Sequence, residues 1–145
     1  MFKDKFVPTP LTANEQYTWM TLWSVADAPL VFGGDLTQLD DFTLNILTND
    51  EVIAVNQDAL GKAGAPISKN GSLEVWAKPM EDGSTAVGLF NRGDADGDVV
   101  VKWSDLSIHG KHQVRDLWRQ KELGSFDNEF TMKVGSHGAE MVRIR

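Results

Sequence analysis

The sequence pattern changes near Gly61, and this change constrains the fold more than any other feature. Before Gly61, apolar residues recur at the spacing of amphipathic helices. After it, they alternate with polar residues, as in half-buried strands. The 145 residues suffice for one ordinary domain or two small units. The sequence therefore predicts an α+β chain with two parts, residues 1–60 and 61–145.

A first helix is predicted to begin at Thr12. Thr12 and Glu15 can form a capping box, in which each side chain satisfies a free backbone N–H of the first turn. The apolar face of this helix is predicted from the spacing i, i+3, i+4 and i+7, which selects Trp19, Leu22, Trp23 and Ala26. We expect the helix to end before Pro29, because proline disfavours helical geometry in the preceding residue.

The run Leu30–Phe32 is followed by two glycines and suits a short strand buried on both faces of a parallel sheet. A second helical stretch is predicted from about Asp40 to Asn56, with Asn49 as a point where it breaks in two. Helix, buried strand and helix form an α/β repeat. One strand cannot make a sheet, so its neighbours must come from other polypeptide.

The remainder of the chain predicts an antiparallel β-sandwich of short strands. The strand candidates are Leu73–Lys78, Thr85–Asn91, Asp98–Trp103, Gln113–Trp118, Phe130–Val134 and Ala139–Ile144. Turn signals separate them at Lys69–Gly71, Glu81–Gly83, Ala95–Gly97, His109–Gly110 and Gly135–Gly138.

Composition excludes several function classes. The formal net charge of −7 argues against nucleic acid, which proteins bind through Lys and Arg. No apolar run reaches the length of a membrane span, so we expect no membrane partner. The chain has no cysteine and hence no disulfide framework. Residues Met1–Pro10 lack the layout of a signal peptide, and the sequence assigns no compartment.

Several carboxylates are candidates for chemistry. Asp35 directly follows the predicted strand, and active sites of β/α barrels lie at the carboxyl ends of strands. The alternative, which we favour, is that Asp35 caps the next loop or helix. The other nearby carboxylates make a poor glycosidase pair and better suit helix capping and solvation: Asp40, Asp41, Asp50, Glu51 and Asp58.

No metal site is predicted. Asp94, Asp96 and Asp98 alternate around Gly97, but the later glycine and the bidentate Glu of a calcium-binding EF-hand loop are missing, so we expect a solvated hairpin turn. The histidines show no metal-binding spacing and are expected on strands or the surface: His109, His112 and His137.

The aromatic residues of the β region allow two interpretations. Exposed rings could stack on the apolar faces of sugars. Buried rings would fill the sandwich core or its contact with the helical part, which we favour. The residues concerned are Trp76, Phe90, Trp103, Trp118 and Phe126.

Nearly the whole chain resembles melibiase-type α-galactosidases, of glycoside hydrolase family 27. The most specific block is Val52–Asp58 followed by Leu60 and Gly61. Further matching motifs are Leu11–Tyr17, Leu22–Ser24, Ala28–Leu30, Gly34–Leu36, Leu47–Glu51, Glu74–Pro79, Val87–Arg92, Trp103–Leu106 and Val114–Trp118. The chain departs from frequent family residues at Trp19, Gly34 and Ala59, which leaves the sugar specificity open.

The resemblance implies a (β/α)8 barrel followed by an antiparallel β-sandwich. Residues 1–60 would be the last barrel elements, with the eighth strand at Leu30–Phe32, and residues 61–145 the sandwich. It also implies retaining hydrolysis of terminal α-galactosides by the parent enzyme. The catalytic aspartates of the family lie on earlier barrel strands without counterpart here, and Asp35 aligns with a non-catalytic position. No catalytic, cofactor-binding or metal residue is therefore assigned, and no cofactor is expected.

Three roles follow. In the first, which the resemblance implies, the chain would be the carboxy-terminal portion of an α-galactosidase and inactive alone. Its partner would be the remainder of the barrel, and the parent enzyme would act on galactosides. The alternatives are a stand-alone carbohydrate-binding module and a sandwich that braces the barrel; a contact between copies of the chain is left open.

Overall fold

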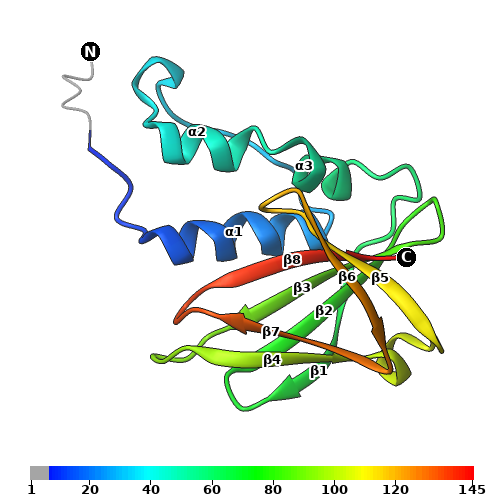
Figure 1. Ribbon diagram of the computed structural model, residues 1–145. Helices are drawn as coiled ribbons and strands as arrows, with labels where there is room; N and C mark the ends of the chain where they lie inside the picture. Colours follow the sequence, from blue (N-terminus) through cyan, green and yellow to red (C-terminus); the bar gives the residue numbers. More distant parts are fainter. Residues whose placement is uncertain (1–6) are drawn as a thin grey trace.

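The computed structural model describes residues 7–145, in which a helical region precedes an antiparallel β-sandwich, as predicted (Figure 1). The helices are α1 (Ala13–Val25), the 3₁₀ helix η1 (Leu36–Gln38), α2 (Asp41–Leu47), α3 (Asp50–Asn56) and the 3₁₀ helix η2 (Trp103–Leu106). The strands are β1 (Ala65–Asn70), β2 (Leu73–Pro79), β3 (Thr85–Asn91), β4 (Gly97–Lys102), β5 (Lys111–Asp116), β6 (Lys121–Asp127), β7 (Glu129–Val134) and β8 (Ala139–Ile144). Six residues of the stretch in which no signal peptide is predicted, 1–6, lie outside the described part.

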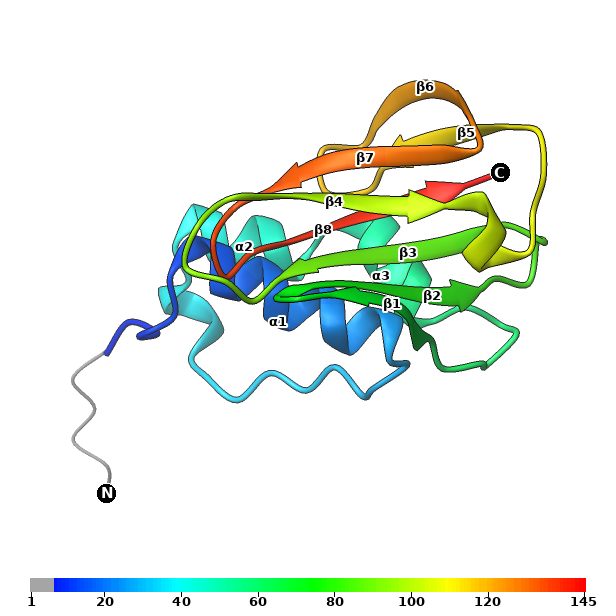
Figure 2. The same ribbon diagram turned by 90° about the horizontal axis from the view of Figure 1, so that it is seen from below.

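The strands form a six-stranded sheet of order β1-β2-β3-β8-β5-β6 and a two-stranded sheet of β4 and β7. The smaller sheet covers one face of the larger, and α1 covers the other (Figure 2). The central strands β3 and β8 are therefore buried on both faces, which their nearly continuous apolar sequences permit. The core between the sheets contains Val75, Val87, Leu89, Val99, Val101, Trp103, Val114, Phe130, Val134, Val142 and Ile144.

A second apolar cluster lies between the helices and the six-stranded sheet and includes Met20, Val25, Val52, Val55, Leu117 and Met141. Helix α1 approaches the sheet closely at Gly88, where an added Cβ would lie 3.3 Å from the Thr21 methyl group and nearer still to the Phe90 ring. Glycine thus provides the room that the helix needs.

The buried face of α1 is not the one predicted. It consists of Met20, Thr21, Ser24 and Val25, whereas the predicted residues Trp19, Leu22, Trp23 and Ala26 are only partly covered or exposed. Small side chains fit where helix and sheet meet closely, and the large rings turn away. The spacing rule selected the more hydrophobic face, which this chain does not bury against the sandwich.

The caps of the helices follow the prediction. Thr12 and Glu15 form the capping box of α1. The second helical stretch is broken at Asn49, whose side-chain oxygen accepts a hydrogen bond from the Val52 N–H at 3.1 Å and so starts α3. The Asn49 amide also donates to the backbone oxygens of Leu117 and Trp118, at 3.1 and 3.2 Å. Asn49 therefore starts α3 directly after Thr48, the C-cap of α2, and ties this junction to the turn after β5.

The predicted strand Leu30–Phe32 does not form. The segment has no regular structure, and the side chain of Val31 is 78% exposed. A strand of a parallel sheet needs neighbouring strands for its backbone hydrogen bonds, and the described residues offer none. We call Leu30–Phe32 the strand-competent segment, because its apolar run is typical of a buried strand.

Two further differences concern the sandwich. The edge strands β1 and β6 escaped prediction because their sequences are polar and interrupted by Pro66 and Gly124, and both contain register shifts. The expected hairpin around Asp94–Asp98 is wrong, because β3 pairs with β2 and β8 whereas β4 pairs with β7. The connection passes from one sheet to the other.

Candidate functional site

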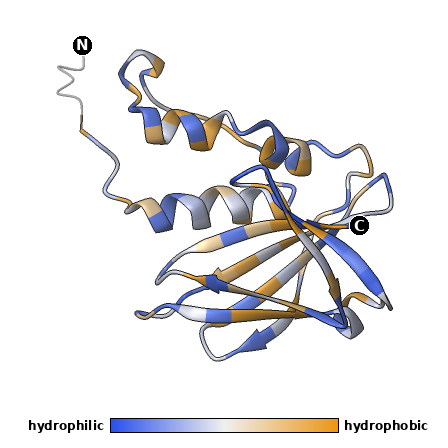
Figure 3. Cartoon of the chain, in the orientation of Figure 1, coloured by the Kyte–Doolittle hydropathy of each residue, from blue (hydrophilic) through white to orange (hydrophobic). Residues whose placement is uncertain are grey.

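An apolar groove lies between α1, α2 and the segment that joins them. It encloses about 320 Å³ and is lined mainly by large aliphatic and aromatic side chains, among them Trp19, Leu30, Val31, Phe32, Leu36, Leu39, Leu44, Leu47 and Ile53. We call this set the apolar face. Hydrophobic residues recur along α2 and the preceding segment in Figure 3. Val31, Leu36 and Leu44 expose 78%, 68% and 45% of their surface.

A second cavity of about 220 Å³ continues the groove toward the start of α1. It shares Trp19, Phe32 and Leu47 with the first and adds Leu11 and Ile46. The Trp19 ring also lies against that of Trp23, with centroids 5.6 Å apart. A contiguous apolar surface with a polar rim marks an interaction site rather than the ordinary scatter of exposed apolar residues.

Asp35 is a capping residue. Its carboxylate accepts hydrogen bonds from the Thr37 hydroxyl, the Thr37 N–H and the Gln38 amide at 2.6, 2.9 and 3.0 Å, and so starts η1. These bonds, that from the Thr37 hydroxyl first, lower the pKa of Asp35 below its usual value. A general acid of a glycosidase needs a raised pKa. The favoured interpretation is thus confirmed, and Asp35 is a poor candidate for proton donation.

The other carboxylates of the helical region have structural partners. Asp40 caps α2 and accepts from the Thr43 N–H at 2.7 Å, which lowers its pKa. Asp41 and Asp50 lie in the first turns of α2 and α3. Glu51 binds Arg115 of β5 through two hydrogen bonds of 2.6 and 2.9 Å. The carboxylate of Asp58 accepts from two backbone N–H groups, those of Leu60 and Glu81.

The acidic residues after β3 bind within the sandwich. The carboxylate oxygen Oδ1 of Asp94 lies 2.9 Å from His137 Nε2. The carboxylate of Asp96 accepts a hydrogen bond from the Ser136 N–H at 3.2 Å. Both interactions tie this crossover to the turn before β8. Within residues 7–145, no group of three His, Cys, Asp or Glu side chains could hold a metal ion. No helix in that range is long and apolar enough to cross a membrane.

The five aromatic residues considered for sugar stacking are largely covered. Trp103 is 1% exposed and its indole N–H donates to the Phe126 oxygen. The Trp118 indole donates to the Thr21 hydroxyl at 3.0 Å, beneath α1. Phe90 is 4% exposed, and Trp76 and Phe126 are half-buried. The favoured interpretation as core and interface residues is confirmed.

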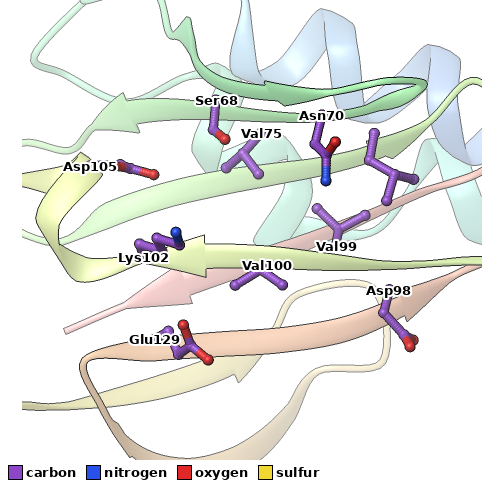
Figure 4. A pocket seen from close by; sticks show the side chains of 10 residues that line it. Ser68, Asn70, Val75, Asp98, Val99, Val100, Lys102, Asp105 and Glu129 are labelled. Atoms are coloured by element: carbon purple, nitrogen blue, oxygen red, sulfur yellow. The ribbon is translucent and has the colours of Figure 1, made fainter.

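A further cavity of about 370 Å³ lies between β1, β2 and the free edge of β4 (Figure 4). Its polar lining includes Ser68, Asn70, Asp98, Lys102 and Glu129, all on or near the surface. No aromatic ring lines it, so the stacking that favours sugar binding is missing.

Two family models match the chain. Residues 70–144 match the α-galactosidase C-terminal β-sandwich domain, and residues 7–58 match α-galactosidase A. The chain belongs to the α-galactosidase family. Together the two matches span both the helical region that bears the apolar face and the sandwich.

Individual members of the α-galactosidase family share about a third of their residues with this chain. α-Galactosidase 2 of Arabidopsis thaliana and the α-galactosidase of Cyamopsis tetragonoloba are each 37% identical, over 92% and 90% of this chain. These stretches are 34% and 32% of the two relatives, so the chain spans about a third of their length.

Solved structures of the family share the fold. α-Galactosidase I of Mortierella vinacea superposes with a TM-score of 0.89 at 30% identity, over 92% of this chain and 36% of that one. A family 27 β-L-arabinopyranosidase of Geobacillus stearothermophilus gives 0.88 at 32% identity, over 94% and 31%. Enzymes with this fold are thus named for different sugars, galactose and arabinose.

Proposed function

We propose that the chain is the carboxy-terminal portion of a retaining α-galactosidase and is inactive alone. In this proposal residues 1–60 complete a (β/α)8 barrel and residues 61–145 form the sandwich that braces it. The catalytic aspartates belong to the remainder of the barrel, and the parent enzyme acts on terminal α-galactosides. The exposed apolar face carries the proposal, since it offers apolar side chains of α1, α2 and α3 and the strand-competent segment to a partner.

The carboxylates support the same assignment. A retaining glycosidase needs two carboxyl groups about 5 Å apart, one as the nucleophile and one as the acid. The pKa values of these two groups must differ. In the helical region Asp35 and Asp40 have lowered pKa values and cap helices, and Glu51 is held by Arg115. A sugar-binding module is not favoured, because the tryptophans considered for stacking are buried or half-buried.

A chimera tests the proposal. The first two thirds of the Cyamopsis tetragonoloba α-galactosidase, ending before the matched region, would be joined to residues 7–145. We expect the chimera to cleave a chromogenic α-galactoside and the chain alone to be inactive. The matched control joins the same relative to residues 7–60 only. If bracing is needed, this control unfolds at a lower temperature and loses activity.

Two outcomes would overturn the proposal. One is cleavage by the chain alone that is abolished by replacing one of its own aspartates. The other is a folded chimera, verified by circular dichroism, that does not cleave α-galactosides while the intact relative does.

A further inference from the structure

A buried ion pair joins the sandwich to the end of α1. Lys78 of β2 is fully buried, and its ammonium group lies 2.7 Å from Asp27 Oδ1 and 2.8 Å from the backbone oxygen of Lys62. Asp27 is partly exposed, with 25% of its side-chain surface accessible. The two residues are 51 positions apart in the sequence, so no local sequence pattern predicts the pair.

Asp27 occupies the point where the chain leaves α1. Its φ of 58° lies in the left-handed region, which Asp tolerates better than most residues, and the chain turns there toward Pro29. Further hydrogen bonds hold the same turn, and one of them joins the Ala28 N–H to the Trp23 oxygen at 3.0 Å. The Gly64 N–H donates to the Val25 oxygen at 2.7 Å, and the Asn56 side chain donates to the Ala28 oxygen at 2.8 Å.

These contacts end abruptly at residue 28. Within residues 7–145, no hydrogen bond is formed by residues 29–34, and Val31 is mostly exposed. The strand-competent segment thus starts from a fixed turn and continues without hydrogen bonds, although Leu30 packs against the helical cluster. The direction in which it leaves the turn decides whether its edges can meet neighbouring strands.

Stability alone does not account for a lysine at this place. Removing the Lys78 charge from water costs about as much as its attraction to Asp27 returns, so an apolar residue of similar volume commonly stabilises as well as a buried lysine. A charged pair differs from an apolar contact in fixing a single geometry, because Lys78 Nζ must meet two particular oxygens at once.

We propose that Lys78 is a positioning residue. Through Asp27 it sets the direction in which residues 29–32 leave α1, so that the sandwich orients this segment for strand pairing with the remainder of the barrel. The identity of that partner rests on the proposed function, whereas the orienting role is a property of this chain and can be measured on it alone.

The test measures the spread of positions of Val31. The chain has no cysteine, so two introduced cysteines are the sole attachment sites for spin labels. Val31→Cys places one label on the segment, and Lys111→Cys places the other on β5. Double electron–electron resonance then gives the distance distribution between them. In the Lys78→Met variant, we expect a distribution about twofold broader than in the unsubstituted chain, because a released segment samples many positions. The unfolding midpoint should change little.

Val101→Ala is the matched control. Val101 is 1% exposed in the sandwich core, away from the turn, so this variant should lower the unfolding midpoint and leave the distribution narrow. An unchanged distribution in Lys78→Met, with the fold intact, would overturn the proposal. So would equal broadening in Val101→Ala. Failure of the chimera to cleave galactosides would contradict the proposed function and leave this result standing.

Discussion

The two partners of the buried pair differ in what their removal leaves behind. Asp27→Asn leaves the ammonium group of Lys78 fully buried without a countercharge, whereas Lys78→Met leaves a carboxylate that water can reach. We therefore expect Asp27→Asn to lower the free energy of unfolding by about 3 kcal/mol, and Lys78→Met by much less. Urea denaturation of both variants measures this. Equal losses would show that burial of the lysine charge is not the dominant cost.

Asp82 provides a pH-dependent contact at the same scale. Hydrogen bonds from the Ser84 hydroxyl and N–H lower the pKa of Asp82 to about 2, and Arg143 adds an ion pair at 2.9 Å. Because the folded pKa is depressed below 3.8, this stabilisation is present above that pH and is lost as the pH falls toward 2.

Asp82→Asn should therefore flatten the dependence of stability on pH between 4 and 2. The effect at neutral pH should be at most about 1 kcal/mol, because the side chain is half-exposed and solvent screens the pair. Thermal unfolding at several pH values measures the slope. A slope identical to that of the unsubstituted chain would contradict this account.

At the scale of elements, two helix caps form a natural comparison. Asp40 caps α2 within its own turn, whereas Asn49 caps α3 and also donates to the turn after β5. We expect Asp40→Ala to cost about 1 kcal/mol, the usual value of a cap. Asn49→Ala should cost about 2 kcal/mol, since it removes a cap and leaves backbone oxygens near Trp118 without their donor. Urea unfolding of both variants checks the order, and equal losses would mean that the long-range bonds contribute nothing.

Elements whose signal is local could be predicted from the sequence. The capping box of Thr12 and Glu15, the break at Asn49 and the capping role of Asp35 each depend on residues within one turn. Strand β3 is predicted with its observed bounds, because its apolar residues are continuous. The exposed apolar face follows from the same reasoning, since an isolated α/β repeat lacks neighbours for its strand.

Elements that depend on a partner could not be predicted. The buried face of α1 is chosen by the space above Gly88, and the Lys78–Asp27 pair by a fold that joins distant segments. The polar edge strands β1 and β6 acquire their structure from β2 and β5. Leu30–Phe32 illustrates the reverse case, in which the strand signal is local but the hydrogen-bond partners are absent from the described chain.

At the scale of the whole molecule, the faces of the larger sheet and the apolar face differ in how well they are covered. The larger sheet is covered on both faces, whereas the apolar face beside α1 and α2 is open to solvent. We expect the isolated chain to self-associate through this face as its concentration rises, because burying apolar surface contributes about 25 cal/mol per Å². Sedimentation velocity over a range of concentrations measures the association.

The variant Val31→Ser with Leu36→Ser removes the two most exposed side chains of the apolar face, and it should shift the chain toward monomer without loss of secondary structure. Leu60→Ser is the matched control, because Leu60 is 39% exposed but lies outside that set. Equal association of all three proteins would show that the contact lies elsewhere. If the double variant is monomeric and also fails to restore activity in the chimera, the surface that drives self-association is the one that the rest of the barrel needs. Self-association would then be a consequence of the missing partner rather than a function of the chain.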